Sequence, residues 1–192
     1  KIGKYSLDFD GTNDYVETAN NSSLNYYNKA SAFTATGWVK SSTSAFEYIW
    51  GKCDTAGVQP GWWGAFTNSL IYMRVNDASA GYNTRLYAQG TGNASDGNWH
   101  HLAFVKTTGY SSVADLKIYL DGTSLSLSDA GSSAALSYGP SSSVGMRLGD
   151  MGFAAANSEF TGQIDEFSFW SGSLSQANIT SLAAGAKANA IT

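Results

Sequence analysis

The sequence has little that could cross-link the chain or bind a soft metal. Its 192 residues include one cysteine, Cys53, so no disulfide can form within the chain. One cysteine and 2 histidines also exclude the zinc clusters that combine several thiolate and imidazole ligands. A lone cysteine next to a predicted strand is typical of a small core residue rather than a reactive group.

Charged residues are also scarce. They make up 14% of the chain, against about 25% in an average soluble domain. The 11 Lys and Arg residues are scattered among 15 Asp and Glu residues, for a net charge of −4, which argues against the basic patch of a nucleic-acid-binding protein. No apolar run approaches the roughly 18 residues that a membrane-spanning helix needs, so no membrane span is expected.

Aromatic and small polar residues are abundant instead. The 6 Trp, 11 Tyr and 9 Phe residues, within a hydrophobic content of 43%, indicate a folded rather than a disordered chain. A surface rich in Ser, Thr, Asn and Gly and poor in charge favours an extracellular, cell-surface or virion location. The chain begins at Lys1 without a signal peptide, which indicates either a removed leader or a piece of a longer protein.

Apolar and polar residues alternate with a period of two, which predicts an all-β fold. The expected strands cover residues 5–9, 15–18, 33–39, 47–51, 70–75, 84–89, 98–107, 116–120, 144–148 and 164–169. The strand over residues 70–75 is expected to be buried on both faces. Asp121 and Gly122 predict a tight hairpin turn, because such a turn needs positive φ at both central residues.

One short helix is expected near the C-terminus. Ser175 is a suitable N-cap. Four apolar residues then follow at helical spacing, namely Ile179, Leu182, Ala183 and Ala186. No repeat or change of composition divides the chain, so we expect a single domain over residues 1–192. The tail from about residue 187 is either a fraying end or the start of a linker.

Four segments resemble, in order, parts of the laminin G-like, concanavalin A-like lectin and glucanase domains. They are Ser6–Val16, Phe33–Val39, Trp99–Val105 with Leu116–Gly122, and Phe160–Phe167. The resemblance implies a jelly-roll sandwich of two antiparallel sheets followed by a short C-terminal helix. The fold hosts lectins, adhesion modules, glycosidases and phage structural proteins, so it does not decide the function.

The same resemblance implies one structural calcium ion between the first and last strands, which tend to lie side by side in these jelly rolls. Asp10, Asp14 and Asp165 match the family pattern, with Gly11 at the turn. Oxygen ligands of this kind suit calcium better than zinc. The alternative is a turn in which these carboxylates accept hydrogen bonds from backbone N–H groups.

Aromatic residues in loops form a second candidate site, because aromatic rings can stack on the apolar faces of sugars. Trp62 and Trp63 follow a Pro-Gly loop signal, so at least one of them is expected to be exposed. Tyr82 is the third ligand-binding candidate, and Tyr26, Tyr27 and Phe153 lie in similar surroundings. The alternative for each is burial in the core. The tryptophans in strand patterns are expected to fill the core: Trp38, Trp50, Trp99 and Trp170.

The pattern of a catalytic site is not evident. Retaining glycosidases hold two carboxylates about 5–5.5 Å apart, and the pair Asp8 and Asp10 does not match the spacing of the glucanase relatives. His100 and His101 are adjacent and should point to opposite faces of their strand. We therefore expect no enzyme but a binding module for a glycan or another cell-surface ligand. The alternatives are a structural or decoration domain that contacts neighbouring virion proteins, and a glucanase-like hydrolase.

Overall fold

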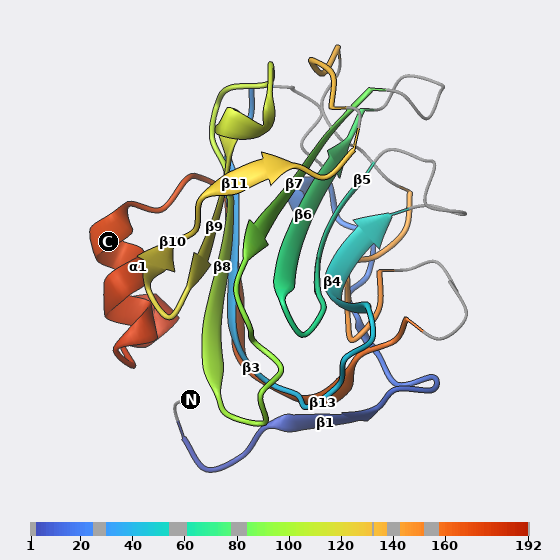
Figure 1. The fold of residues 1–192 in the computed structure, drawn as a ribbon, viewed down its shortest axis with the longest axis vertical. Helices are drawn as coiled ribbons and strands as arrows, with labels where there is room; N and C mark the ends of the chain where they lie inside the picture. The colour runs from blue at the N-terminus through green and yellow to red at the C-terminus, as the bar shows by residue number, and fades with distance from the viewer. Residues whose placement is uncertain are drawn as a thin grey trace.

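Two antiparallel sheets stack face to face in the computed structural model of the chain (Figure 1). The structure describes residues 3–24, 30–53, 61–77, 84–131, 133–137, 143–151 and 158–191. The all-β jelly-roll sandwich with a short C-terminal helix, predicted from the sequence, is confirmed.

The two sheets contain most of the regular structure. The six-stranded sheet has the order β1 (Leu7–Asp10), β13 (Thr161–Trp170), β3 (Phe33–Lys40), β8 (His100–Lys106), β9 (Leu116–Leu120), β10 (Thr123–Ser124). The seven-stranded sheet has the order β11 (Leu127–Asp129), β7 (Arg85–Thr91), β6 (Leu70–Asn76), β5 (Gly61–Phe66), β4 (Glu47–Cys53), β12 (Arg147–Leu148), β2 (Val16–Glu17). In the described residues, the helical segments are α1 (Gln176–Ala183) and the short 3-10 turns Ser22–Leu24, Val113–Asp115 and Ala188–Ala190.

The core lies between the two sheets and is rich in aromatic rings. Trp50 of β4 packs edge-on against Phe104 of β8, with ring centroids 5.6 Å apart. Trp62 of β5 packs in the same way against Phe33 of β3, at 5.9 Å. Both tryptophans have a relative exposure of 0%. These contacts cross from one sheet to the other and hold the sandwich together.

The core contains different tryptophans from those expected. Of the four assigned to it, only Trp50 is fully buried, and Trp38, Trp99 and Trp170 are half-buried. Trp38, for example, lies on the outer side of the six-stranded sheet, where its ring meets that of His101 at 5.5 Å. Trp62 fills the core instead; it lies in β5, where the preceding Pro-Gly signal predicts a loop.

The hairpin and the C-terminal helix agree with the sequence prediction. Asp121 and Gly122 have φ values of 50° and 79°, as a tight primed turn requires. The Ser175 side chain accepts a hydrogen bond from the backbone N–H of Asn178, and so caps α1. Ile179 of α1 packs on the outer face of the six-stranded sheet, against a cluster from β8 and β9. Figure 1 shows α1 lying against this face.

Removal of one core ring tests the role of the contact between the sheets. Phe104→Ala should lower the free energy of unfolding by about 3–5 kcal/mol, because it removes a buried ring and leaves a cavity beside Trp50. Urea denaturation followed by tryptophan fluorescence measures this change. Lys117→Ala on the exposed side of β9 is the control, expected to change stability by less than about 0.5 kcal/mol.

Candidate ligand-binding face

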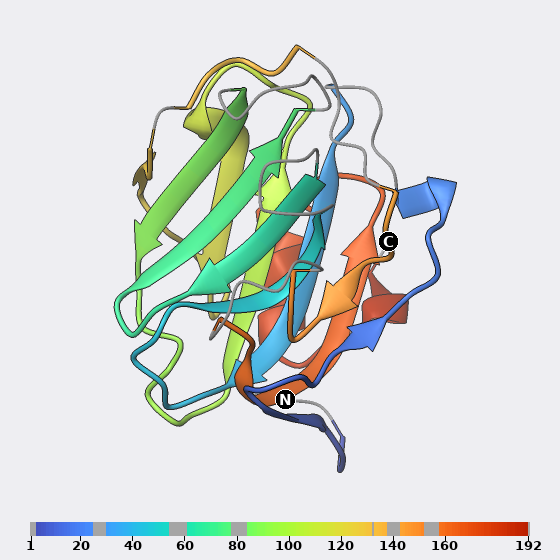
Figure 2. The same ribbon diagram turned by 90° about the vertical axis from the view of Figure 1, so that its right-hand side faces the viewer.

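The outward face of the seven-stranded sheet carries an unusual set of side chains. Strand pairing places Trp63, Arg74 and Tyr87 in one row across β5, β6 and β7. The next row holds Ala65, Tyr72 and Gln89. We call the following residues the aromatic face: Phe46, Tyr48, Trp63, Tyr72, Arg74, Arg85 and Tyr87. Figure 2 looks onto this side of the sheet.

Alternation along β6 explains how these residues reach the surface. Ile71, Met73 and Val75 point into the core with exposures of 0%. Tyr72 and Arg74 lie between them in sequence, point outward and are half-buried. The expectation that this strand is buried on both faces is therefore wrong, because one of its faces forms part of the molecular surface.

The rings of the aromatic face contact one another in a continuous layer. Trp63 is the centre, with Tyr48, Tyr87 and Phe46 packed edge-on against it at centroid distances of 5.2, 5.5 and 6.0 Å. Tyr72 is tilted against Tyr87 at 6.0 Å. Trp63 itself is 3% exposed, whereas the tyrosines around it are half-buried. The layer therefore offers tyrosine rings and hydroxyls to the outside and uses Trp63 as their support.

Arg74 gives the aromatic face a positive charge. Its guanidinium carbon lies 5.7 Å from the centre of the Tyr87 ring, and its Nε donates a hydrogen bond of 2.6 Å to Asn76 Oδ1. Among the residues that the structure describes, no carboxylate forms an ion pair with Arg74. Arg85 lies nearby and donates to the Gly131 carbonyl from Nε and Nη2, at 3.2 and 3.0 Å.

Burial changes the protonation equilibria on this face. Desolvation, with the charge of Arg85 second, lowers the pKa of Arg74. Desolvation likewise raises the pKa of Tyr87, and it raises the pKa of Tyr48 to about 12. Tyr48 and Tyr87 therefore stay neutral near pH 7, and their hydroxyls can both donate and accept hydrogen bonds.

The structure corrects the expected position of the loop tryptophans. Trp62 and Trp63 lie in β5, with exposures of 0% and 3%, so neither is an exposed loop residue. β5 begins at Gly61, directly after the loop signal. Its two tryptophan rings point to opposite faces of the sheet, Trp62 toward the core and Trp63 toward the aromatic face. Tyr82, with Tyr26, Tyr27 and Phe153, lies outside the described residues.

Of the predicted calcium ligands, Asp10 and Asp14 are close to each other, whereas Asp165 lies further along the sheet. β1 does pair with the last strand, as expected, and Asp10 faces Thr161. Asp165 is four residues further along β13, roughly 13 Å away at the rise of a strand. In the described parts of the chain, no three His, Cys, Asp or Glu residues are grouped as metal ligands would be. The three aspartates together thus do not fit one ion.

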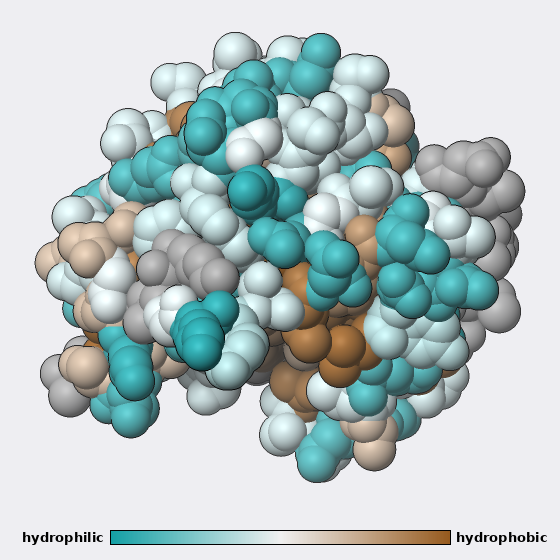
Figure 3. All heavy atoms as spheres, turned by 90° about the horizontal axis from the view of Figure 1, so that it is seen from below, coloured by the Kyte–Doolittle hydropathy of each residue, from teal (hydrophilic) through white to brown (hydrophobic). Residues whose placement is uncertain are grey.

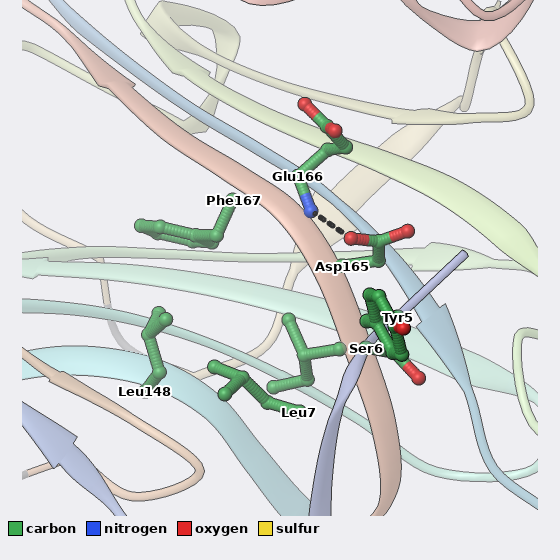
Figure 4. A pocket seen from close by; sticks show the side chains of 8 residues that line it. Tyr5, Ser6, Leu7, Leu148, Asp165, Glu166 and Phe167 are labelled. Atoms are coloured by element: carbon green, nitrogen blue, oxygen red, sulfur yellow. Dashed lines mark hydrogen bonds between the residues drawn. The ribbon is translucent and has the colours of Figure 1, made fainter. Parts of the chain in front are cut away.

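Each aspartate has a hydrogen bond to the backbone. Asp14 Oδ2 accepts from the N–H of Asp10 at 3.0 Å, and Asp10 Oδ1 accepts from the N–H of Thr12 at 2.9 Å. Gly11 between them has a φ of 79°, which favours glycine. Asp165 Oδ1 accepts from the N–H of Glu166 at 3.0 Å, as the dashed line in Figure 4 shows. Calcium binding stays a prediction.

The two adjacent histidines have different environments. His101 is 2% exposed, and desolvation lowers its pKa to about 4. His100 bridges two carboxylates, with Nδ1 2.8 Å from Asp121 Oδ2 and Nε2 3.0 Å from Asp96 Oδ1. Both ring nitrogens of His100 are thus engaged, which leaves neither free to act as a base.

The geometry defines a jelly-roll sandwich with an aromatic, positively charged outer face. The chain belongs to the concanavalin A-like lectin/glucanases superfamily, since the laminin G family model of that description matches residues 10–180. No curated protein matches the sequence. In the described residues, no helix has the length and apolar character to cross a membrane.

Several solved structures share the fold at low sequence identity. The binding domain of botulinum neurotoxin serotype G has a TM-score of 0.67 and 13% identity, covering 95% of this chain and 45% of that one. The binding domain of Paraclostridial mosquitocidal protein 1 has a TM-score of 0.64 and 12% identity, covering 95% and 46%. The heptameric SAP-like pentraxin of Limulus polyphemus has a TM-score of 0.61 and 12% identity, covering 93% and 81%. The chain thus spans less than half of either toxin chain, and likeness at this identity shows the fold alone.

The environment of His100 predicts a pH-dependent stability. Burial lowers its pKa, but the hydrogen bonds to Asp121 and Asp96 outweigh that effect and raise the pKa above 6.5. The bridge should therefore stabilise the fold fully below about pH 6.5 and lose its effect as the pH rises through the folded-state pKa. Urea denaturation should show that His100→Gln is most destabilising in acid. A difference from the wild type that grows with pH would contradict this assignment.

Removal of calcium tests the remaining metal prediction. An ion bound only by the folded chain stabilises it, so a chelator should lower the thermal unfolding midpoint, and added calcium should restore it. Asp14→Asn should abolish the response to calcium if the turn binds the ion. A midpoint that is the same with chelator and with calcium would overturn the prediction.

Proposed function

We propose that the chain is a non-catalytic binding module that recognises an acidic glycan through the aromatic face. The observation that carries this proposal is the position of Arg74. A half-buried guanidinium lies among tyrosine rings, and no described carboxylate is paired with it. The extracellular or cell-surface location favoured by the composition suits such a role.

The tyrosines supply the sugar-binding chemistry of the face. Aromatic rings stack on the apolar faces of sugars, where burial of apolar surface drives association. Tyr72 and Tyr87 are tilted by 34° relative to each other and stand on adjacent strands. Their hydroxyls and the side chain of Gln89 can exchange hydrogen bonds with sugar hydroxyls. Because the rings are already packed against Trp63, little side-chain entropy is lost on binding.

Arg74 favours a sugar that carries a carboxylate or sulfate over a neutral one. A guanidinium binds such planar or multi-oxygen anions with two parallel hydrogen bonds. Burial removes water from the Arg74 guanidinium and so disfavours its charged form, which lowers its pKa. An anionic ligand next to the guanidinium would stabilise the charged form. The aromatic face as defined contains no Asp or Glu, whereas glycoside hydrolysis requires two carboxylates. Binding without hydrolysis is therefore the function that the residues favour.

The similar structures add a consistent context. Two of them are described as the binding domains of toxins. Their names speak of binding rather than catalysis, and we extend that general role, without the particular ligand, to this chain. This context supports a binding module over the hydrolase alternative.

Glycan binding by matched variants tests the proposal. A panel of neutral, carboxylated and sulfated oligosaccharides should show binding only to the acidic ones, with an affinity that falls as salt is raised. Arg74→Gln should weaken binding about tenfold or more, because a hydrogen bond to a charged group contributes about 1.5–3 kcal/mol. Tyr72→Ala should weaken it as well, through loss of the stacking surface. Isothermal titration calorimetry measures both changes.

Lys117→Gln is the control, since it removes one positive charge from the other sheet. It should leave the affinity unchanged. Trp63→Ala should instead destabilise the chain, because it removes the ring against which Phe46, Tyr48 and Tyr87 pack. A lower thermal unfolding midpoint distinguishes this effect from a loss of binding alone. Equal binding of neutral and acidic sugars, or equal loss in Arg74→Gln and Lys117→Gln, would overturn the proposal.

A further inference from the structure

A crevice opens at the point where β1 ends beside β13. The pairing of these two strands stops at Leu7, which lies opposite Ile164. Beyond that point, among the described strands, β13 is paired with β3 alone. The crevice has a volume of about 260 Å³ and is lined by residues 5–7, residues 164–167 and Leu148. Because Leu148 belongs to β12 of the other sheet, the crevice lies between the two sheets.

One side of the crevice is apolar. Figure 4 shows Leu7, Leu148 and Phe167 together on this side, which we call the apolar wall, and Asp165 and Glu166 on the other. Leu7 is 46% exposed, so water contacts part of the wall. Figure 3, which views the molecule from below, shows apolar side chains in a hollow with hydrophilic ones around it. A ligand that covers the apolar wall would gain free energy by removing this surface from water.

A β-bulge in β13 brings two carboxylates to the other side of the crevice. The register of β13 against β3 shifts between Asp165 and Ser168. Glu166, inside the bulge, has a φ of 50°, a left-handed conformation that a residue with a Cβ adopts only at a cost. Consecutive side chains of a regular strand point to opposite faces. The bulge interrupts this alternation, and Asp165 and Glu166 both line the crevice.

Neither carboxylate has a cation beside it. Across the residues that the structure describes, no Lys, Arg or His forms an ion pair with Asp165 or Glu166. Asp165 Oδ1 accepts a hydrogen bond from the N–H of Glu166, whereas Asp165 Oδ2 has almost no contact with solvent and accepts none from a described residue. A carboxylate oxygen that is removed from water without a donor is costly. The crevice therefore offers two unpaired carboxylates to a cation with N–H groups.

We propose that the crevice binds a small primary amine, whose ammonium group donates to Asp165 Oδ2 and whose apolar body packs on the apolar wall. Glu166 adds a second negative charge beside the ammonium. Tyr5 also lines the crevice and is 78% exposed, so few contacts hold its ring, and it turns aside as the ammonium reaches Oδ2. The amine is a free arylalkylamine or the N-terminal residue of a peptide, since both join an ammonium to an apolar group.

Size and charge select this class of ligand. The volume of 260 Å³ is below the roughly 300–1,000 Å³ of pockets for drug-sized ligands, so it suits one ring or a short chain rather than an oligosaccharide. Asp165 and Glu166 would repel an anion. A quaternary ammonium has the positive charge but no N–H to donate to Oδ2. Calcium takes six to eight oxygen ligands, and the apolar wall has no side-chain oxygen.

Matched small molecules provide the first test. Phenethylamine has the ammonium and the ring, hydrocinnamate has the same ring with a negative charge, and the trimethylammonium derivative keeps the positive charge without a donor. In an NMR titration, phenethylamine should bind saturably and shift the backbone amide signals of Leu7 and Glu166. Hydrocinnamate should not bind. The quaternary derivative should bind about tenfold or more weakly, because it lacks the hydrogen bond to a charged group.

Short peptides distinguish the two sources of the amine. A tripeptide that begins with leucine presents an α-ammonium next to an apolar side chain, and its N-acetylated form lacks the charge. Tighter binding of the free peptide than of phenethylamine assigns the crevice to a peptide N-terminus, and the reverse order assigns it to a free amine. Acetylation should abolish peptide binding in either case. An acetylated peptide that binds as tightly as the free one would contradict the proposal.

Variants test the role of each side of the crevice. Asp165→Asn keeps an oxygen that can accept from the N–H of Glu166 but removes the charge, so it should weaken phenethylamine binding about tenfold or more. Leu7→Ala should weaken binding as well, because it removes part of the apolar wall. Asp8→Asn is the matched control, since Asp8 is exposed and does not line the crevice, and it should leave the affinity unchanged. Circular dichroism and thermal unfolding verify that the three variants are folded.

The proposal fails on any of three results. They are no saturable binding of phenethylamine to the wild type, equal affinity for phenethylamine and hydrocinnamate, and an equal loss of affinity in Asp165→Asn and Asp8→Asn. None of these measurements involves a glycan or the aromatic face. Failure of amine binding therefore leaves the proposed function to its own test.

Discussion

The structure depends on the contact between aromatic rings of the two sheets. Trp50 and Trp62 of one sheet pack against Phe104 and Phe33 of the other, and all four are buried. Because a strand directs alternate side chains to opposite faces, this packing fixes which residues of β5 and β6 point outward. The position of Arg74 and Tyr72 on the aromatic face is thus a consequence of the burial of Met73 between them.

Much of the fold could be read from the sequence, because most strands alternate clearly between apolar and polar residues. The hairpin at Asp121 and Gly122 and the N-cap at Ser175 were also predictable, since both depend on local chemistry. β5 was missed for a physical reason. Gly61–Phe66 has apolar residues on both faces and follows a Pro-Gly signal, so neither alternation nor turn chemistry marks it as a strand.

The candidate site was harder to predict than the fold, because it depends on register between strands. Pairing of β1 with β13 could be expected, but nothing local to Asp10 or Asp165 indicates that four residues separate them along the pair. The aromatic face likewise combines residues of β4 to β7, and Phe46 directly before β4, that are up to about 40 positions apart. Only the alignment of Trp63, Arg74 and Tyr87 across three strands shows that they form one surface.

The burial of Cys53 has a practical consequence. Its exposure is 0% in β4, so alkylating reagents can reach the sulfur only when this part of the sandwich opens. The rate of its modification therefore reports how often the native chain opens around β4. Conversely, a cysteine introduced at an exposed position is the one that reacts under native conditions. A fluorophore or spin label can thus be attached at a single chosen place while the natural thiol is kept.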